Sequence, residues 1–89
     1  MEKEGANEKK VGVISHYYPG IGVAVVEVNE ELKVGDEIAI RGYTTDFTQK
    51  IESMEIAHKK IDVAKNGNSI GLKVKDRVRE EDKVYKVRL

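Results

Sequence analysis

The sequence contains no cysteine and no tryptophan, and its 89 residues include a single proline. Without cysteine the chain can form no disulfide framework, no thiolate metal site and no thiol nucleophile. No apolar run approaches the roughly 18 residues that a membrane-spanning helix needs. Residues 1–10 also lack the apolar core of a secretion signal. These absences favour a cytoplasmic protein with no membrane partner.

An excess of charge of one sign is also missing, because 16 basic residues balance 16 acidic ones. This balance excludes a strong overall field toward nucleic acid, although a local basic stripe stays open. The hydrophobic fraction of 39% is enough for one small core. Residues 1–10 mix both charges and have little to bury, so we predict a disordered tail there and one domain over residues 11–89. The alternative is that the tail is a basic arm that grips phosphate, but the glutamates of the tail offset its lysines.

Short strand patterns separated by turn residues fill the rest of the chain. β-Branched and aromatic residues dominate residues 11–18, and Pro19 and Gly20 then supply turn chemistry. Apolar residues occupy both faces of residues 23–28, as in a strand that is covered on two sides or faces a partner. The predicted strands are 11–18, 23–28, 36–41, 47–57, 69–75 and 83–89. With no helical periodicity, they predict an all-β fold, a small closed six-stranded antiparallel β-barrel.

Two segments depart from plain strand alternation. Within residues 47–57 the apolar positions change faces, which predicts a bulge or sharp bend near Glu52-Ser53. Residues 61–64 are predicted to form a single helical turn. Each of three turn-forming pairs precedes a strand, so we expect the strands to be entered through similar corners. These pairs are Gly35-Asp36, Asn66-Gly67 and Glu81-Asp82.

Catalytic patterns are weak. The sequence has no glycine-rich phosphate-binding loop with its lysine. Ser15 and His16 are neighbours on a strand and point to opposite faces, so they cannot act together as nucleophile and base. His58 could instead act as a base for a distant serine, and this leaves a small hydrolase as an alternative to the two binding functions considered below. A metal site needs at least three converging ligands, which two separated histidines do not predict. We therefore predict no enzyme activity, no catalytic or metal-binding residue and no cofactor.

Binding is the function that the remaining residues favour. Aromatic rings at or near loops can stack on bases or grip a peptide, and the alternative is that one or two of them plug the barrel ends. These residues are Tyr17, Tyr18, Tyr43 and Phe47. A basic patch forms if adjacent strands align the basic residues of the second half of the chain; the alternative is that they serve solubility and edge protection. They are Lys50, His58, Lys59, Lys60, Lys73 and Lys75.

A family resemblance rests on three segments, "KVGDEI" (33–38), "IESMEI" (51–56) and "DVAKNGNSIGL" (62–72). In this order and spacing they resemble the second domain of translational GTPases, the β-barrel of elongation factor Tu and of elongation factor 1 alpha. The resemblance covers residues 11–87. Residues 46–54 are also similar to the C-terminal barrel of collagenase-like peptidases, a family associated with RNA hydroxylation.

The resemblance implies a stand-alone, monomeric translation-factor-like barrel that binds tRNA, ribosomal RNA or the ribosome. In that family the domain helps to hold the aminoacylated tRNA end. Glu55 matches a family carboxylate beside that pocket, and Ser69 falls where the family has an asparagine. The chain departs from the family at Ile21 and Glu81, where the family has arginine and glycine. The alternative is a protein-interaction module that docks on a separate GTPase or RNA-modifying enzyme chain through residues 23–28. The residues assigned to RNA or partner binding are Lys50, Glu55, His58, Lys59, Lys60, Ser69, Lys73, Lys75 and Tyr43.

Overall fold

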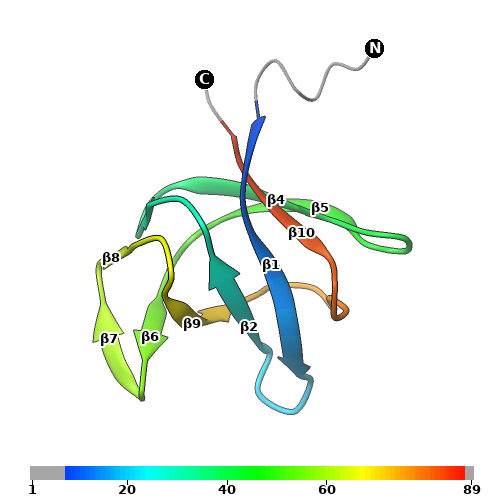
Figure 1. The fold of residues 1–89 in the computed structure, drawn as a ribbon. Coiled ribbons are helices and arrows are strands. Elements are labelled where there is room, and N and C mark those ends of the chain that lie inside the picture. Colours follow the sequence, from blue (N-terminus) through cyan, green and yellow to red (C-terminus); the bar gives the residue numbers. More distant parts are fainter. Residues whose placement is uncertain (1–7, 88–89) are drawn as a thin grey trace.

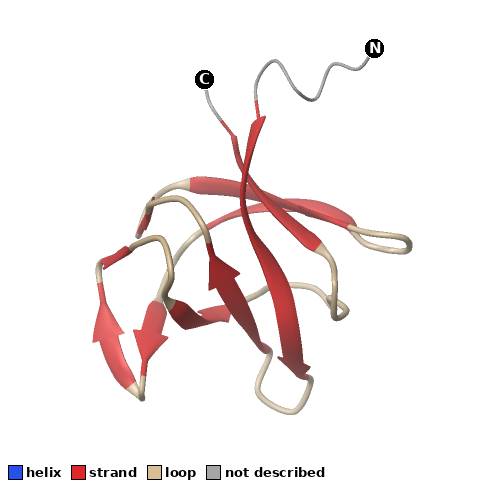
Figure 2. Cartoon of the chain, in the orientation of Figure 1, coloured by secondary structure: helices blue, strands red, loops and turns tan. Residues whose placement is uncertain are grey.

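A computed structural model describes residues 8–87, and within that range the chain forms ten strands and no helix (Figures 1 and 2). Residues 8–87 therefore contain no helix that is long and apolar enough to cross a membrane. The strands are β1 (Glu8–Tyr18), β2 (Val23–Val28), β3 (Leu32–Lys33), β4 (Glu37–Arg41), β5 (Asp46–Lys50), β6 (Met54–Ile56), β7 (Lys59–Ile61), β8 (Val63–Ala64), β9 (Ser69–Lys73) and β10 (Lys83–Val87). The all-β prediction is confirmed.

The main sheet is open, so the prediction of a closed six-stranded barrel is wrong. Its eight strands follow the order β5-β4-β10-β1-β2-β9-β6-β7, all pairs antiparallel, while β3 and β8 form a separate two-stranded sheet. The reason lies in the segment that was predicted as one strand, residues 47–57. It divides into β5 and β6, which belong to opposite ends of the sheet, and Figure 1 shows them well separated.

A side chain, rather than a strand ladder, joins the edge strand β5 to the far part of the sheet. The Gln49 Nε2 group donates to the Lys73 carbonyl at 2.9 Å, and the Lys75 N–H donates to Gln49 Oε1 at 2.8 Å. One amide thus satisfies two backbone groups across the opening. The sheet curls enough to bring these segments together without continuing its hydrogen-bonded pairing.

The break that divides β5 from β6 falls at residues 51–53, where the bend was predicted. It lets Ile51 and Met54 both enter the core, each with 1% of its surface exposed. The helical turn predicted at 61–64 is wrong. Val63 and Ala64 form β8 instead, because pairing with β3 buries Leu32 and Ala64 opposite each other.

Strand β1 begins at Glu8, so residues 8–10, which were predicted to belong to the tail, pair with β10. The rest of that tail, residues 1–7, lies outside the described residues. Register shifts occur in β1 between Lys10 and Gly12 and again between Ile14 and His16. The first shift allows Val11 and Ile14 both to face the core despite their odd spacing.

Three corners of the fold repeat one four-residue turn. In each, the carbonyl of the first residue accepts from the N–H of the fourth residue at 2.9–3.1 Å. The side-chain oxygen of the fourth residue accepts in return from the N–H of the first residue at 2.8–2.9 Å. The corners are Lys33–Asp36, Lys65–Asn68 and Arg79–Asp82. The similarity predicted from the turn-forming pairs is therefore one hydrogen-bonding pattern used three times.

The third residue of each corner has a positive φ, as the type II turn requires. Gly35 and Gly67 take φ values of +98° and +95°, which glycine adopts at little cost. Glu81 occupies the same place in the third corner with a φ of +79°. A residue with a Cβ is strained in this region, so the third corner keeps the hydrogen bonds of the other two and carries backbone strain in addition.

Candidate partner-binding grooves

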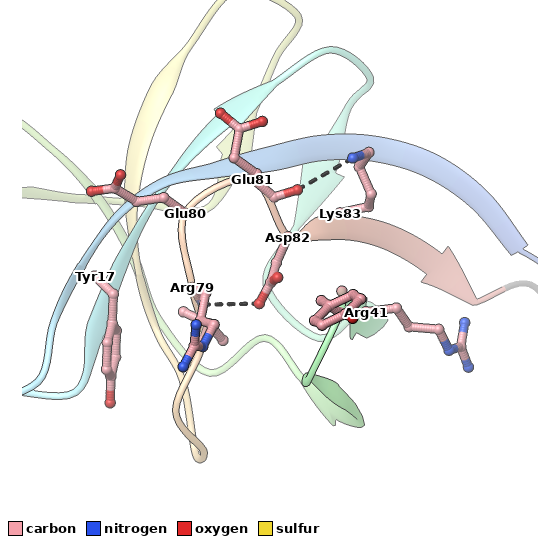
Figure 3. Close-up of a pocket in the computed structure, with 10 residues that line it drawn as sticks. Tyr17, Arg41, Arg79, Glu80, Glu81, Asp82 and Lys83 are labelled. Atoms are coloured by element: carbon pink, nitrogen blue, oxygen red, sulfur yellow. Dashed lines mark hydrogen bonds between the residues drawn. The ribbon is translucent and has the colours of Figure 1, made fainter.

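A hollow lies beside the third corner, and we call it the Arg79 groove (Figure 3). Its volume is about 540 Å³. The lining comes from β1, from the loop between β4 and β5, and from the corner that enters β10. The lining residues are Tyr17, Arg41, Gly42, Tyr43, Val78, Arg79, Glu80, Glu81, Asp82 and Lys83.

Two tyrosines of this groove differ in how the fold holds them. Tyr17 packs against the core and is only partly exposed. Tyr43, in the loop between β4 and β5, is fully exposed at 102% of its reference surface. A tyrosine that finds no cover in its own domain is the residue type that protein interfaces favour.

Asp82, whose carboxylate is buried beneath the groove, holds the backbone around the groove in place. Its carboxylate is buried and accepts from the Arg79 N–H at 2.8 Å. A Cβ placed on Gly42 would lie 1.8 Å from Asp82 Oδ1, so the glycine is what lets the two segments touch. The main chain of the third corner also bonds to β1, with the Glu81 N–H donating to the Ile14 carbonyl at 2.8 Å. The Tyr43 loop and the Arg79 corner are thus held against each other.

The charges at the groove are mostly committed to other contacts. Arg41 donates to Glu8 and to Asp46, and its guanidinium lies 5.9 Å from the centre of the Tyr85 ring. The hydrogen bond with Glu8 raises the pKa of Arg41 above its usual value, and that with Asp46 adds to the rise, while burial opposes both. The Glu80 carboxylate lies 3.2 Å from His16 Nδ1, and within residues 8–87 it has no other hydrogen-bond or ion-pair partner.

A second site, which we call the Glu55 groove, lies on the outer face of β2, β9 and β6. It consists of two adjoining hollows of about 270 and 290 Å³ that share Ile21, Val23, Glu55 and Gly71. Tyr18 and Ile21 stand at its rim with 48% and 63% of their surfaces exposed. Val25, which also lines the groove, is only partly buried. Strand β2, whose residues 23–28 were predicted to be apolar on both faces, thus has apolar residues on its outer face as well as in the core.

The turn between β6 and β7 forms one wall of the Glu55 groove and is strained. Ala57 and His58 both have positive φ, +53° and +68°, in a two-residue loop closed by the pair Ile56 and Lys59. This is the turn type in which asparagine and glycine are normally found. The sequence therefore places two unfavourable residues side by side at a groove.

The residues predicted to bind RNA or a partner fall on several surfaces. Glu55, His58 and Ser69 meet in the Glu55 groove, with Lys73 at its second hollow. Lys50, Lys73 and Lys75 line another hollow, of about 320 Å³, with Gln49 and Glu52. Lys59 and Lys60 are exposed on the edge strand β7, and Tyr43 belongs to the Arg79 groove.

Sequence reasoning missed Arg79 and the apolar rim residue Ile21. The sequence did contain an indication for Arg79, because this residue is the first of the third repeated corner and its backbone position is therefore fixed. Nothing in the sequence indicated that the loop carrying Tyr43 would lie beside that corner, since the contact between Gly42 and Asp82 joins residues far apart in the chain.

The groups considered for catalysis are separated. Ser15 Oγ donates to a Glu27 carboxylate oxygen at 3.1 Å, and His16 pairs with Glu80. Ser69 Oγ donates to that same Glu27 oxygen at 2.8 Å. Within residues 8–87, no three His, Asp or Glu side chains are grouped to hold a metal ion.

Comparison with known proteins points to peptidases. No family model matches the chain. It is 39% identical over 77 residues to an uncharacterized protease of Methanocaldococcus jannaschii. It is 38% identical over 86 residues to a collagenase of Porphyromonas gingivalis. These alignments cover 85% and 92% of this chain but only 19% and 21% of the relatives, so the chain spans about a fifth of their length.

The fold matches a solved domain over nearly its whole length. The selenomethionine form of the C-terminal domain of a Geobacillus thermoleovorans protein assigned to the U32 peptidases superposes with a TM-score of 0.82 at 25% identity. The match covers 85% of this chain and 96% of that domain. A second structure of the same domain gives a TM-score of 0.83 and covers 97% of both chains.

The similarity is therefore to the C-terminal domain of U32 peptidases and collagenase-like proteins, a small β domain. The identification with the second domain of translational GTPases is not supported, and the prediction of a translation-linked RNA-, tRNA- or ribosome-binding module is wrong. The physical reason lies in two of the segments that suggested it, 33–38 and 62–72. Each contains a copy of the repeated type II corner, which is a feature of turn chemistry that unrelated small β domains can share.

Proposed function

We propose that this chain is a non-catalytic accessory domain of the U32 peptidase type, which binds protein or peptide segments for a separate catalytic part. The observation that carries the proposal is the pattern of coverage. The chain corresponds to nearly all of a C-terminal peptidase domain, yet to about a fifth of proteins named as protease or collagenase. Four fifths of those relatives, with room for a catalytic domain, lie outside the match.

The arrangement of side chains agrees with a binding role. Ser15 and Ser69 both bond to Glu27, rather than to a histidine that would activate them as nucleophiles. His58 is exposed in a tight turn. The surface instead offers two grooves with exposed aromatic and aliphatic side chains, as expected of a domain that contacts other proteins.

A domain exchange in the M. jannaschii relative tests the proposal. Three enzymes are compared: the whole protease, the protease without the 77 matched residues, and a chimera that carries this chain in their place. Cleavage of unfolded casein and of a short blocked peptide is measured for each. We expect deletion to slow casein cleavage while leaving the short peptide unaffected, and the chimera to restore the casein rate. This chain alone should cleave neither substrate.

Matched variants separate binding from catalysis. If this chain alone hydrolyses casein, and Ser15→Ala or His58→Ala abolishes that activity, the domain is an enzyme and the proposal is wrong. If the deletion lowers cleavage of both substrates equally and the chimera restores neither, the segment has no substrate-binding role. Circular dichroism of each variant establishes that it is folded.

A further inference from the structure

We propose that the Arg79 groove binds acidic peptide segments, with a side-chain carboxylate of the peptide pairing with the Arg79 guanidinium in the groove that Tyr17 and Tyr43 also line. This inference deepens the proposed function, on which it rests, by naming a site and the chemistry of the segment bound. It arises from the charges that the fold leaves uncommitted at the groove.

The positive charge of Arg79 faces the groove without an internal partner. Within residues 8–87, no hydrogen bond or ion pair engages its guanidinium, and only its backbone N–H is used, by Asp82. Arg41, by contrast, is held by Glu8 and Asp46. Of the two arginines at the groove, Arg79 is therefore the one whose five N–H donors remain for a ligand.

The nearby carboxylates do not occupy the same side. Figure 3 shows the side chains of Tyr17 and Arg79 extending downward, whereas Glu81 extends upward from the corner and Glu80 extends to the side. Glu80 pairs with His16, and the Asp82 carboxylate is buried beneath the corner. A peptide carboxylate that approaches Arg79 from the side toward which Tyr17 and Arg79 extend thus meets a cation on the side opposite to Glu81.

The residue types suit a peptide better than a compact ion. A guanidinium binds a carboxylate through two parallel hydrogen bonds, and tyrosine rings supply contact area for the neighbouring side chains of the peptide. The groove, at about 540 Å³, has space for a few side chains. Tyr43 is entirely exposed in the free domain, so covering it on binding removes apolar surface from water.

The backbone that carries these groups is already fixed. The corner is closed by the bond between Asp82 and the Arg79 N–H, and the contact of Gly42 with Asp82 places the Tyr43 loop beside it. On the side of the domain, only side chains need to be ordered when the peptide binds, and this reduces the entropic cost of binding.

The test uses a fluorescein-labelled peptide, blocked at its C-terminus, in which two adjacent glutamates are flanked by leucines. A matched peptide has glutamines in place of the glutamates. We expect the glutamate peptide to bind the full chain at least about tenfold more tightly in fluorescence anisotropy, because a charged hydrogen-bonded pair is lost in the control. The difference should shrink as salt is raised.

Variants then locate the site. Arg79→Gln should remove the preference for glutamate, whereas Arg77→Gln, a neighbouring exposed arginine that does not line the groove, should change affinity by less than about twofold. Tyr43→Ala should weaken both peptides together. Arg79→Lys keeps the charge but loses the two-point contact, so it should restore only part of the affinity.

Several results would overturn the proposal. Equal binding of the two peptides, or equal losses from Arg77→Gln and Arg79→Gln, would mean that no specific carboxylate site exists. If Ile21→Ser weakens peptide binding and Arg79→Gln does not, the Glu55 groove is the binding site, and the accessory function survives while this inference fails. Failure of the chimera to restore casein cleavage refutes the proposed function itself, which keeps the two failures distinguishable.

Discussion

Replacing Glu81 by glycine should stabilise the protein, because the third corner holds a residue with a Cβ at a φ of +79°. The left-handed region costs such a residue about 1–2 kcal/mol. Glycine removes that strain but loses about 0.5–1 kcal/mol more backbone entropy on folding. The net expectation is a gain of roughly 0.5–1 kcal/mol for Glu81→Gly. The Glu81 carbonyl and N–H keep their bonds to Lys83 and Ile14, since both are backbone groups.

The reverse change at the first corner should have the opposite sign. Gly35 has a φ of +98° and no atom within 4 Å of the position that a Cβ would take, so Gly35→Ala introduces strain without a clash. We expect a loss of roughly 0.5–1 kcal/mol. The same reasoning applies to Gly67, at +95° and with equally open space around it.

Thermal unfolding followed by circular dichroism measures these effects. A change of 1 kcal/mol shifts the midpoint of a domain of this size by about 4–8 °C, so Glu81→Gly should raise Tm by about 2–8 °C. Glu81→Ala is the matched control, because it removes the carboxylate but keeps the Cβ, and it should leave Tm nearly unchanged. If Glu81→Ala raises Tm as much as Glu81→Gly does, charge rather than backbone strain is responsible. A fall in Tm for Glu81→Gly would refute the strain argument outright.

Three further changes probe close contacts and strain elsewhere. Gly42→Ala should destabilise the protein by about 1–3 kcal/mol, because a Cβ 1.8 Å from the Asp82 carboxylate forces that side chain off its buried hydrogen bond. In urea unfolding, Asp82→Asn, which keeps an acceptor oxygen, should lower the free energy of unfolding by less than Asp82→Ala does. Equal losses from these two variants would contradict this account. Gly12→Ala should lower Tm, since its Cβ would lie 2.8 Å from a carbonyl oxygen and a side-chain carbon of β2, whereas Gly20→Ala, with open space around it, should not lower it comparably. His58→Gly should raise stability by about 0.5–1 kcal/mol by relieving a positive φ of +68°, and an unchanged Tm would show that this turn is not strained.

The local chemistry of the chain was readable without the structure. The positions of the three corners could be anticipated because each depends on adjacent residues. In every corner an aspartate or asparagine at the fourth position has an oxygen that reaches back to the first N–H, and in two of them a glycine at the third position takes the positive φ. The break near Glu52-Ser53 was also readable, since Phe47 and Met54 have opposite parity in one apolar run. Both predictions involve spans of only a few residues.

The errors arose where distant segments decide the outcome. Ile61 to Ala64 resembles a helical turn by itself, but Ala64 pairs with Leu32, and that pairing makes the segment extended. The two halves of residues 47–57 join opposite ends of the sheet, which a strand pattern alone does not reveal. The likeness to a translation factor failed for a related reason, because similar corners can carry different assemblies of strands and different functions.

The sequence by itself determined an all-β domain and the positions of its corners, because both follow from backbone preferences over a few residues. Only the tertiary structure decided that the sheet stays open, that the Gln49 amide links β5 to the end of β9, and that Tyr43 and Arg79 line one groove. Those features depend on contacts such as that of Gly42 with Asp82, between residues that no local pattern connects.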